Sequence, residues 1–341
     1  MRNENLVVRK HRNNVPHLVG FAANLPTDLA PLLILDASAR IRHTYALWEK
    51  ERGSLVRLKT AAKDYSKLKV HWWNKGGGRS SIEKTPNIYA SAIGDIINAS
   101  PDANWLVIYH KPTGTLNLQN QIKNAFNEKR SQPEVKVRFL SWGNHTATND
   151  YKDADHIILA GTLFLPDMEY EARTNAASGK TSTGHRNDKL IAPTKLGEHL
   201  HGVLQAACRG SVRHMTDGMA NACEVYLIAD SRHGIANHIQ HVFPGCQTEE
   251  WIPEPPRLPP KALELVKCLI SFFDKTPLAF YPFTAIKKKL SIKSVQQLTA
   301  LRGHPALLAR LQELEIEEFR PAIRATCYRK IPQVTEAATA L

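Results

Sequence analysis

The chain has 341 residues, enough to bury a sizeable core, and we expect one large and one small domain. Hydrophobic residues make up 43% of it, but no run reaches the roughly 18 uncharged apolar residues of a membrane helix and no signal-peptide pattern is present, so we expect a cytoplasmic protein without a membrane partner. The formal charge of +13, from 45 Lys and Arg against 32 Asp and Glu, favours a polyanionic partner.

After an N-terminal extension (1–30), the chain alternates strand-like apolar runs with segments of helical period. Strands are expected at 31–37, 104–110, 135–143, 155–165 and 223–232, with less clear ones within 54–60 and 68–73. Helices are expected at about 39–51, 87–99, 116–129 and 197–209. Continuous apolar runs that alternate with helices indicate strands buried on both faces of a parallel sheet. The pattern predicts an α/β domain over 31–251, a parallel sheet flanked by helices.

Two polar stretches are interpreted as loops. Gly76, Gly77 and Gly78 predict a mobile loop, and residues 171–194, rich in small polar side chains, predict an exposed insertion. The insertion contains Ser178-Gly179-Lys180-Thr181, but a P-loop needs glycine where Thr174 stands, directly after a strand. We therefore expect no P-loop here, and the chain has no DExD or DExH box.

A second domain is expected after a proline-rich linker at 252–260, which has five prolines in nine positions. Helical patterns at 262–273, 282–290 and 294–314, followed by a hairpin within 319–331, predict a small winged-helix-like α+β domain over 261–341. From residue 257 onward 14 Lys and Arg stand against 7 Asp and Glu, a net charge of +7. The run Lys287-Lys288-Lys289 suits phosphate contacts, and a solvated helix face explains it equally well.

The spacings between the cysteines do not match the paired spacings of a structural zinc site or an iron–sulfur cluster. All five stand far apart along the chain: Cys208, Cys223, Cys246, Cys268 and Cys327. We expect reduced, mostly buried thiols and no metal site.

Gln205, Arg209 and Arg213 are spaced four residues apart. If 197–213 is one helix, they form a polar stripe that projects two guanidiniums from one face. Such a pair suits contact with the γ-phosphate of a nucleotide that a neighbouring domain holds. The alternative is that both are ordinary surface arginines of an amphipathic helix.

The run from Gln205 to Arg213 resembles helicase motif VI, QxxGRxxR. With the trailing Asp217-Gly218 and the Asp230-Ser-Arg232 run, it is similar to the superfamily 2 branch that includes the DinG and XPD helicases. The resemblance implies that Arg209 and Arg213 contact ATP across a cleft between two RecA-like domains, and that Gln205 couples this contact to nucleic acid. Cys208 departs from the motif, which has glycine at that position.

Three further segments stand in the order of that family. Residues 107–114 look like motif IV, 142–161 look like motif V with its following strand, and 35–39 resemble the motif III region at the seam between the two domains. The resemblance implies contacts to a nucleic-acid backbone by His110, Thr113, Gly114, Gly143, Asn144, Thr146, Thr148 and Asn149. Hydroxyl and amide groups bond phosphate oxygens without reading bases, although each could equally cap its own loop.

Together these features predict the C-terminal RecA-like half of an ATP-dependent DNA helicase or translocase. ATP and Mg²⁺ would be shared with a P-loop RecA-like domain on another chain or lost by truncation, and the nucleic acid would be single-stranded DNA. The alternative is a non-catalytic nucleic-acid-binding protein that retains the RecA-like fold.

Overall fold

A computed structural model of the chain describes residues 6–10, 16–21, 30–59, 63–112, 117–127, 135–145, 148–180, 188–253, 258–277, 279–320 and 326–331. The chain folds into two compact units. The first comprises Met1–Lys84, Ile96–Asn120 and Lys129–Ile252, and the second comprises Thr85–Asp95, Gln121–Glu128 and Pro253–Leu341.

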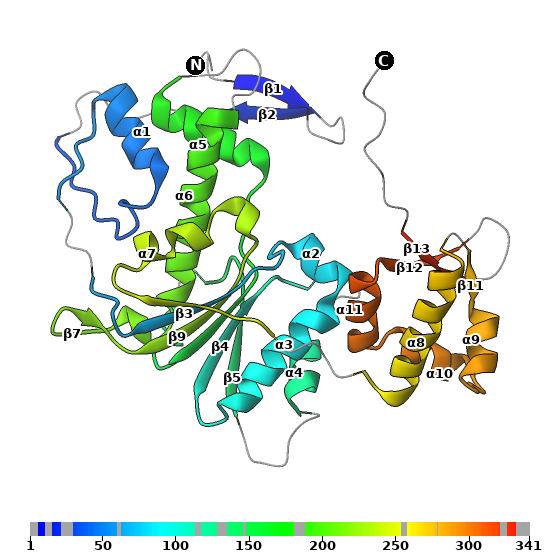
Figure 1. The fold of residues 1–341 in the computed structure, drawn as a ribbon. Helices are drawn as coiled ribbons and strands as arrows, with labels where there is room; N and C mark the ends of the chain where they lie inside the picture. Colours follow the sequence, from blue (N-terminus) through cyan, green and yellow to red (C-terminus); the bar gives the residue numbers. More distant parts are fainter. Residues whose placement is uncertain are drawn as a thin grey trace. The chain divides into compact units, whose positions relative to one another are not determined.

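The first unit contains a six-stranded sheet in the order β10-β3-β9-β6-β4-β5, with every neighbouring pair parallel (Figure 1). Its strands are β3 Leu68–Trp73, β4 Asn104–Tyr109, β5 Lys136–Ser141, β6 His156–Ala160, β9 Cys223–Ile228 and β10 Gln247–Glu250. Helices flank this sheet, so the predicted α/β class with a parallel sheet is confirmed. Strand β10 was not predicted because its sequence, QTEE, is polar, as suits an exposed edge strand.

Helices fill most of the connections between these strands. They are α1 His43–Arg52, α2 Arg79–Lys84, α3 Pro86–Ala99, α4 Leu118–Asn127, α5 Asp167–Ser178, α6 Asp188–Ala207 and α7 Ile239–Val242, with short 3₁₀ turns η1 Ser211–Arg213, η2 Ser231–His233 and η3 Ala236–His238. The predicted helices at 39–51, 87–99, 116–129 and 197–209 correspond to α1, α3, α4 and the second half of α6.

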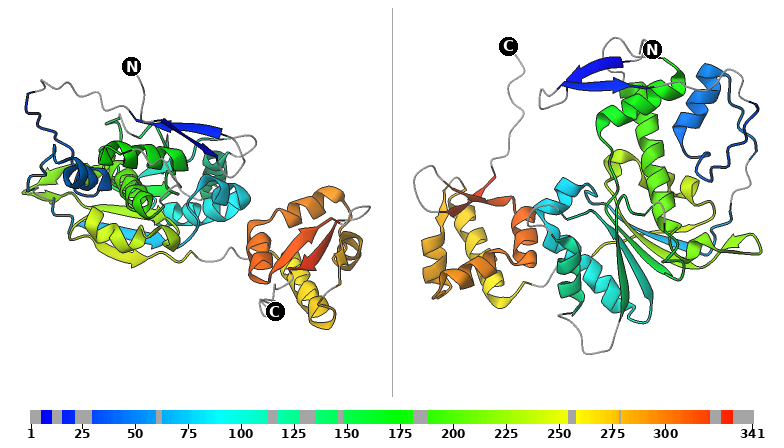
Figure 2. Two further views of the ribbon diagram at one scale, coloured as in Figure 1. Left: turned by 90° about the horizontal axis from the view of Figure 1, so that it is seen from above. Right: turned by 180° about the vertical axis from the view of Figure 1, so that it is seen from behind.

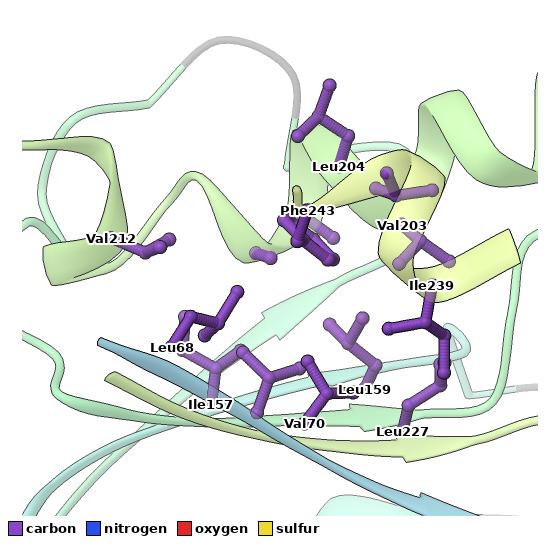
Figure 3. Packing of buried hydrophobic residues seen from close by; sticks show 14 of the residues in the cluster. Leu68, Val70, Ile157, Leu159, Val203, Leu204, Val212, Leu227, Ile239 and Phe243 are labelled. Atoms are coloured by element: carbon purple, nitrogen blue, oxygen red, sulfur yellow. The ribbon is translucent and has the colours of Figure 1, made fainter. Parts of the chain in front are cut away.

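The main core of the first unit lies on one face of the sheet. Every second strand residue, such as Val70 on β3 and Leu159 on β6, points into this core, as the period of two in a strand requires. Val203 and Leu204 of α6 and Ile239 of α7 pack against these side chains (Figure 3).

Two predicted strands are absent from the structure. Residues 31–36 form no strand, and the side chains of Leu32, Leu33, Ile34 and Leu35 are 68%, 67%, 47% and 88% exposed. Residues 54–59 are also irregular, with Val56 77% and Leu58 67% exposed. The apolar residues of these two runs favour burial, but in the described part of the chain neither run pairs with a strand.

The prediction of an exposed insertion at 171–194 is wrong, because most of it belongs to α5 and α6. Ser178 is the last residue of α5 and not part of a strand-to-helix turn, which agrees with the prediction that no P-loop forms there. Glu171, Thr174 and Asn175 of α5 are buried, at most 6% exposed. Helix α5 was not predicted because it is rich in polar residues. Its polar side chains are paired with polar side chains elsewhere in the chain.

Long-range ion pairs supply those partners. A hairpin of β1 Leu6–Lys10 and β2 Pro16–Gly20 lies against α5 (Figure 2), and Arg9 donates to the buried carboxylate of Glu171 at 2.7 Å. On α6, the buried Glu198 accepts from Arg42 at 2.9 Å and from Arg173 at 2.6 Å. A buried carboxylate is tolerated only when it is paired in this way.

From Pro260 onward, the second unit contains the helices α8 to α11 and a three-stranded antiparallel sheet in the order β11-β13-β12. The elements are α8 Pro260–Lys275, β11 Tyr281–Pro282, α9 Phe283–Lys289, α10 Val295–Arg302, α11 Pro305–Glu313, β12 Ile316–Phe319 and β13 Cys327–Lys330. Its core joins helix residues such as Leu265 and Leu307 to Ile316 and Tyr328 of the sheet. The predicted helices are confirmed, and β13 lies within the predicted hairpin range 319–331, but its antiparallel partner β12 lies almost wholly before that range.

All five cysteines are free, and Cys223, Cys246 and Cys327 are buried. Among the residues that the structure describes, no helix combines the length and apolar character needed to cross a membrane.

Candidate functional site

The segment that resembles motif VI begins in α6 and ends outside it. Helix α6 stops at Ala207, Arg209 lies in the turn that follows, and Arg213 ends the 3₁₀ turn η1. The prediction that Gln205, Arg209 and Arg213 form a stripe on one helix is therefore wrong. Gly210 has an extended backbone (φ −90°, ψ −162°), which breaks the helical path between the two arginines.

The two arginines nevertheless lie near each other, because both donate hydrogen bonds to the segment that resembles motif V. Arg209 donates to the carbonyl oxygen of Thr148 at 2.7 Å, and to the backbone and side-chain oxygens of Gln205 at 3.1 and 3.0 Å. Arg213 donates to the side-chain oxygen of Asn149. We call Gln205, Arg209, Arg213, Thr148 and Asn149 the arginine cluster.

Among the described residues, the two guanidiniums of the arginine cluster have no ion-pair partner. Within the described ranges no carboxylate lies within 4.0 Å of either guanidinium, and every hydrogen-bond partner they have there is neutral. Lys63 adds a third cation by donating to the carbonyl oxygen of Arg213 at 2.9 Å. The nearby Asp150 accepts from the hydroxyl of Thr148 at 2.8 Å.

The pKa of Arg209 is lowered, first by partial burial and then by repulsion from Arg213. A guanidinium keeps its charge at physiological pH even so, because its ordinary pKa lies above 12. Two adjacent cations with only neutral partners would gain from an anion, and guanidiniums bind phosphate oxygens in bidentate geometry. The arginine cluster therefore suits a phosphate group.

Gly210 and Cys208 fix the path of the chain beneath these arginines. A Cβ on Gly210 would lie 2.5 Å from the carbonyl oxygen of Ala154 and 2.6 Å from Ile157, so only glycine fits. The next amide, of Ser211, donates to that same carbonyl at 2.7 Å. Cys208, which replaces the glycine of motif VI, packs its thiol against the main core, where burial raises its pKa.

His110, which follows β4, closes a glycine-rich loop at the carboxyl ends of the strands. Its ring is 8% exposed, and Nε2 lies 3.0 Å from the carbonyl oxygen of Gly77, which also accepts from the amide of Thr162 at 2.9 Å. Gly161 has a φ of +91°, and a Cβ there would lie 2.2 Å from the same oxygen. The imidazole of His110 thus holds the loop and is not presented to solvent.

Gly143 and Asn144 form an exposed turn after β5. Gly143 has a φ of +94°, and its amide donates to Nδ1 of His145 at 3.1 Å. His145 is buried beside Trp142, with ring centroids 4.9 Å apart, and burial followed by the charge of Arg209 lowers its pKa to about 4. The turn is therefore anchored by a neutral histidine.

The predicted site residues fall into two groups at opposite ends of the sheet. His110, Gly143 and Asn144 follow the carboxyl ends of β4 and β5, whereas the arginine cluster is anchored at Ala154, before the amino end of β6. The two groups are linked, because the charge of Arg209 acts on His145, which accepts from the amide of Gly143. Thr113, Gly114 and Thr146 lie outside the described residues.

Sequence reasoning missed Lys63 and Gly210. Gly210 stands beside Arg209, and a glycine just after a helix often marks its end, so it could have been found. Lys63 lies 150 residues from Arg213 in sequence and carries no motif. In the part of the chain that the structure describes, no group of three or more His, Cys, Asp and Glu side chains could hold a metal ion.

A comparison of the sequence with protein-family models and with curated proteins finds no match.

Proposed function

We propose that the chain is the second RecA-like half of an ATP-dependent DNA helicase or translocase, and that it completes an ATP site held mainly by a P-loop module elsewhere. The observation that carries this proposal is the arginine cluster, where two guanidiniums converge on Thr148 and Asn149 with no carboxylate within 4.0 Å among the described residues. The all-parallel sheet is consistent with a RecA-like domain.

The residues of the arginine cluster fit a nucleotide phosphate. Bound ATP would supply the γ-phosphate whose transfer to water releases the free energy of the cycle. Arg209 and Arg213 would stabilise the charge on that phosphate, and Gln205 would keep the Arg209 guanidinium in place. The ligands of Mg²⁺ would come from the P-loop module.

The segment from Trp142 to Asn149 connects the two proposed surfaces. One end forms the exposed turn at Gly143 and Asn144, which would contact the backbone of single-stranded DNA, and the other accepts hydrogen bonds from both arginines. A phosphate that draws Arg209 away from Thr148 would change the anchoring of this segment. The proposed site is thus two surfaces joined by one segment.

Residues 31–35 support the need for a second module. Five consecutive apolar residues favour a strand buried on both faces, yet Leu32, Leu33 and Leu35 are each more than 65% exposed. The next residues are fixed: Asp36 accepts from the hydroxyl of Ser38 at 2.6 Å, and Ser38 is fully buried. In the proposed assembly 31–35 joins the edge of the P-loop module's sheet.

The second unit would add a winged-helix-like nucleic-acid contact, with a net charge of +7 from residue 257 onward. Its helices lead into a three-stranded antiparallel sheet with its last two strands adjacent, which is compatible with that architecture.

A non-catalytic nucleic-acid-binding protein is the second candidate. It is favoured by the fact that each guanidinium already has hydrogen-bond partners within the chain, so both could be purely structural. Mixing the chain with a P-loop RecA-like module encoded beside it, and measuring ATP hydrolysis with and without single-stranded DNA, separates the two.

The helicase proposal expects hydrolysis only in the mixture, with a loss of roughly 10³-fold or more in Arg209→Ala, as for an arginine finger. Arg232→Ala is a charge-matched control, since Asp230 pairs with that guanidinium. Activity that is absent from the mixture, or indifferent to Arg209, supports the non-catalytic protein.

A further inference from the structure

The three-stranded sheet of the second unit has one face in the core and one outside it. Ile316 and Tyr328 belong to the core cluster, whereas Phe319 and Arg329 lie on the other face by the alternation of β12 and β13. An outer sheet face of this kind normally carries polar side chains. Here it carries a stack of aromatic and guanidinium planes.

Three planar groups lie together on this face. The rings of Phe280 and Phe319 are parallel, with centroids 5.5 Å apart and an interplanar angle of 14°. The guanidinium of Arg329 lies 3.8 Å from the Phe319 centroid. Phe280 remains 50% exposed. A half-exposed aromatic ring can accept a further planar group on its π-face.

The charges around the stack favour a planar group attached to phosphates. Glu317 is neutralised by Arg329 and Glu318 by Arg302, so neither carboxylate repels an anion strongly. Arg320 directly follows Phe319 and is exposed. The unit carries a net positive charge. An aliphatic protein partner would not need the parallel aromatic planes.

We propose that the ring of Phe280 is a stacking platform for an unpaired nucleobase of single-stranded nucleic acid. The inference rests on the proposed binding of nucleic acid by the chain, and it adds a specific contact in the second unit. A π-face accepts every base, so this contact is indifferent to sequence and requires only that the base be unstacked.

The test is the affinity of the full chain for fluorescent dT20 and for an abasic deoxyribose-phosphate strand of the same length. Phe280→Ala should weaken binding of dT20 by about 5- to 150-fold and leave the abasic strand unchanged. Phe280→Leu, which keeps an apolar side chain without a ring, should behave like alanine, and Phe280→Trp should retain or improve binding. Val295→Ala removes another exposed apolar side chain, 65% exposed, from the same unit and should change nothing.

Unchanged dT20 binding by Phe280→Ala, in a variant that melts like the parent chain, would overturn the stacking platform and leave the proposed function intact. Equal losses on dT20 and the abasic strand would also overturn it, because stacking needs a base. If the parent chain binds neither strand, the proposed nucleic-acid function itself fails and the platform fails with it.

Discussion

The guanidinium of Arg209 donates to the carbonyl oxygen of Thr148 at 2.7 Å, across 61 residues of sequence. This contact joins the segment after α6 to the segment between β5 and β6. A second contact, from Arg213 to Asn149, joins the same two segments. Two stretches that resemble separate helicase motifs thus form one surface.

Inorganic pyrophosphate should bind to this surface, and Arg209→Ala should weaken its binding by roughly 10-fold or more, as for loss of a hydrogen bond to a charged group. Isothermal titration of the parent chain and the variant measures the effect. Arg209→Lys should recover only part of it, because an ammonium lacks the planar fork of the guanidinium.

Arg232→Ala removes the same charge at a guanidinium that Asp230 already neutralises, so it should bind pyrophosphate like the parent chain. An equal loss in both alanine variants would show that only the net charge matters, and the arginine cluster would then not be a defined phosphate site.

Two glycines that lie close together in sequence should respond to alanine in opposite directions. Gly210→Ala should destabilise the chain by about 1–3 kcal/mol, because its Cβ would lie 2.5 Å from a backbone oxygen that cannot easily move. Gly202, inside α6, has no atom within 4 Å of the corresponding position, so Gly202→Ala should stabilise it by about 0.5–1 kcal/mol. Urea unfolding measures both changes, and similar shifts in the two variants would contradict the packing at Gly210.

The fold was predictable where a strand's own residues carry the signal. Continuous apolar runs identified β4, β6 and β9, because strands buried on both faces need apolar residues at every position. The same rule failed at 31–35, since an apolar run shows a need for burial and not where the partner lies. Helix α5 was missed for a different reason. Its buried Glu171 is paired with Arg9, 162 residues away, and no local sequence pattern reveals such a pair.

The proximity of Gln205 to Arg209 was predictable from their spacing, but the placement of Arg213 was not. Spacing alone placed Gln205, Arg209 and Arg213 on one helix, but spacing cannot show that the helix ends at Ala207. The end is set by the close approach of Gly210 to Ala154, a tertiary contact. The contacts of Arg209 with Thr148 and of Arg213 with Asn149 could not be predicted, because they join residues 61 and 64 positions apart in the sequence.

Gly161 and Gly143 both have a φ above +90°, yet alanine should cost more at Gly161. At Gly143 the Cβ would meet no atom within 4 Å, so Gly143→Ala should cost only the backbone strain, about 1–2 kcal/mol. At Gly161 it would lie 2.2 Å from the carbonyl oxygen of Gly77, which should raise the cost to roughly 3 kcal/mol or more. Equal unfolding free energies for the two variants would show that the glycine-rich loop yields without cost.

The buried His199 should make the folded chain less stable in mild acid. Tyr170 lies 2.9 Å from its Nε2, and burial, followed by His233 and Lys195, lowers its pKa to about 3. The unfolded chain takes up a proton at this residue below about pH 6.5, while the folded chain does not until about pH 3. The free energy of unfolding therefore decreases as the pH is lowered from about 6.5 to about 3.

Urea midpoints of the parent chain should therefore decline as the pH is lowered from 7.5 to 4.5. In His199→Phe the midpoints should start lower, because Tyr170 loses a partner. The free energy of unfolding should then decline less steeply than in the parent chain, by up to about 1.4 kcal/mol per pH unit. His145, whose pKa is lowered to about 4, accounts for part of the remaining slope. Parallel pH profiles in the two proteins would mean that His199 is protonated equally in the folded and unfolded states.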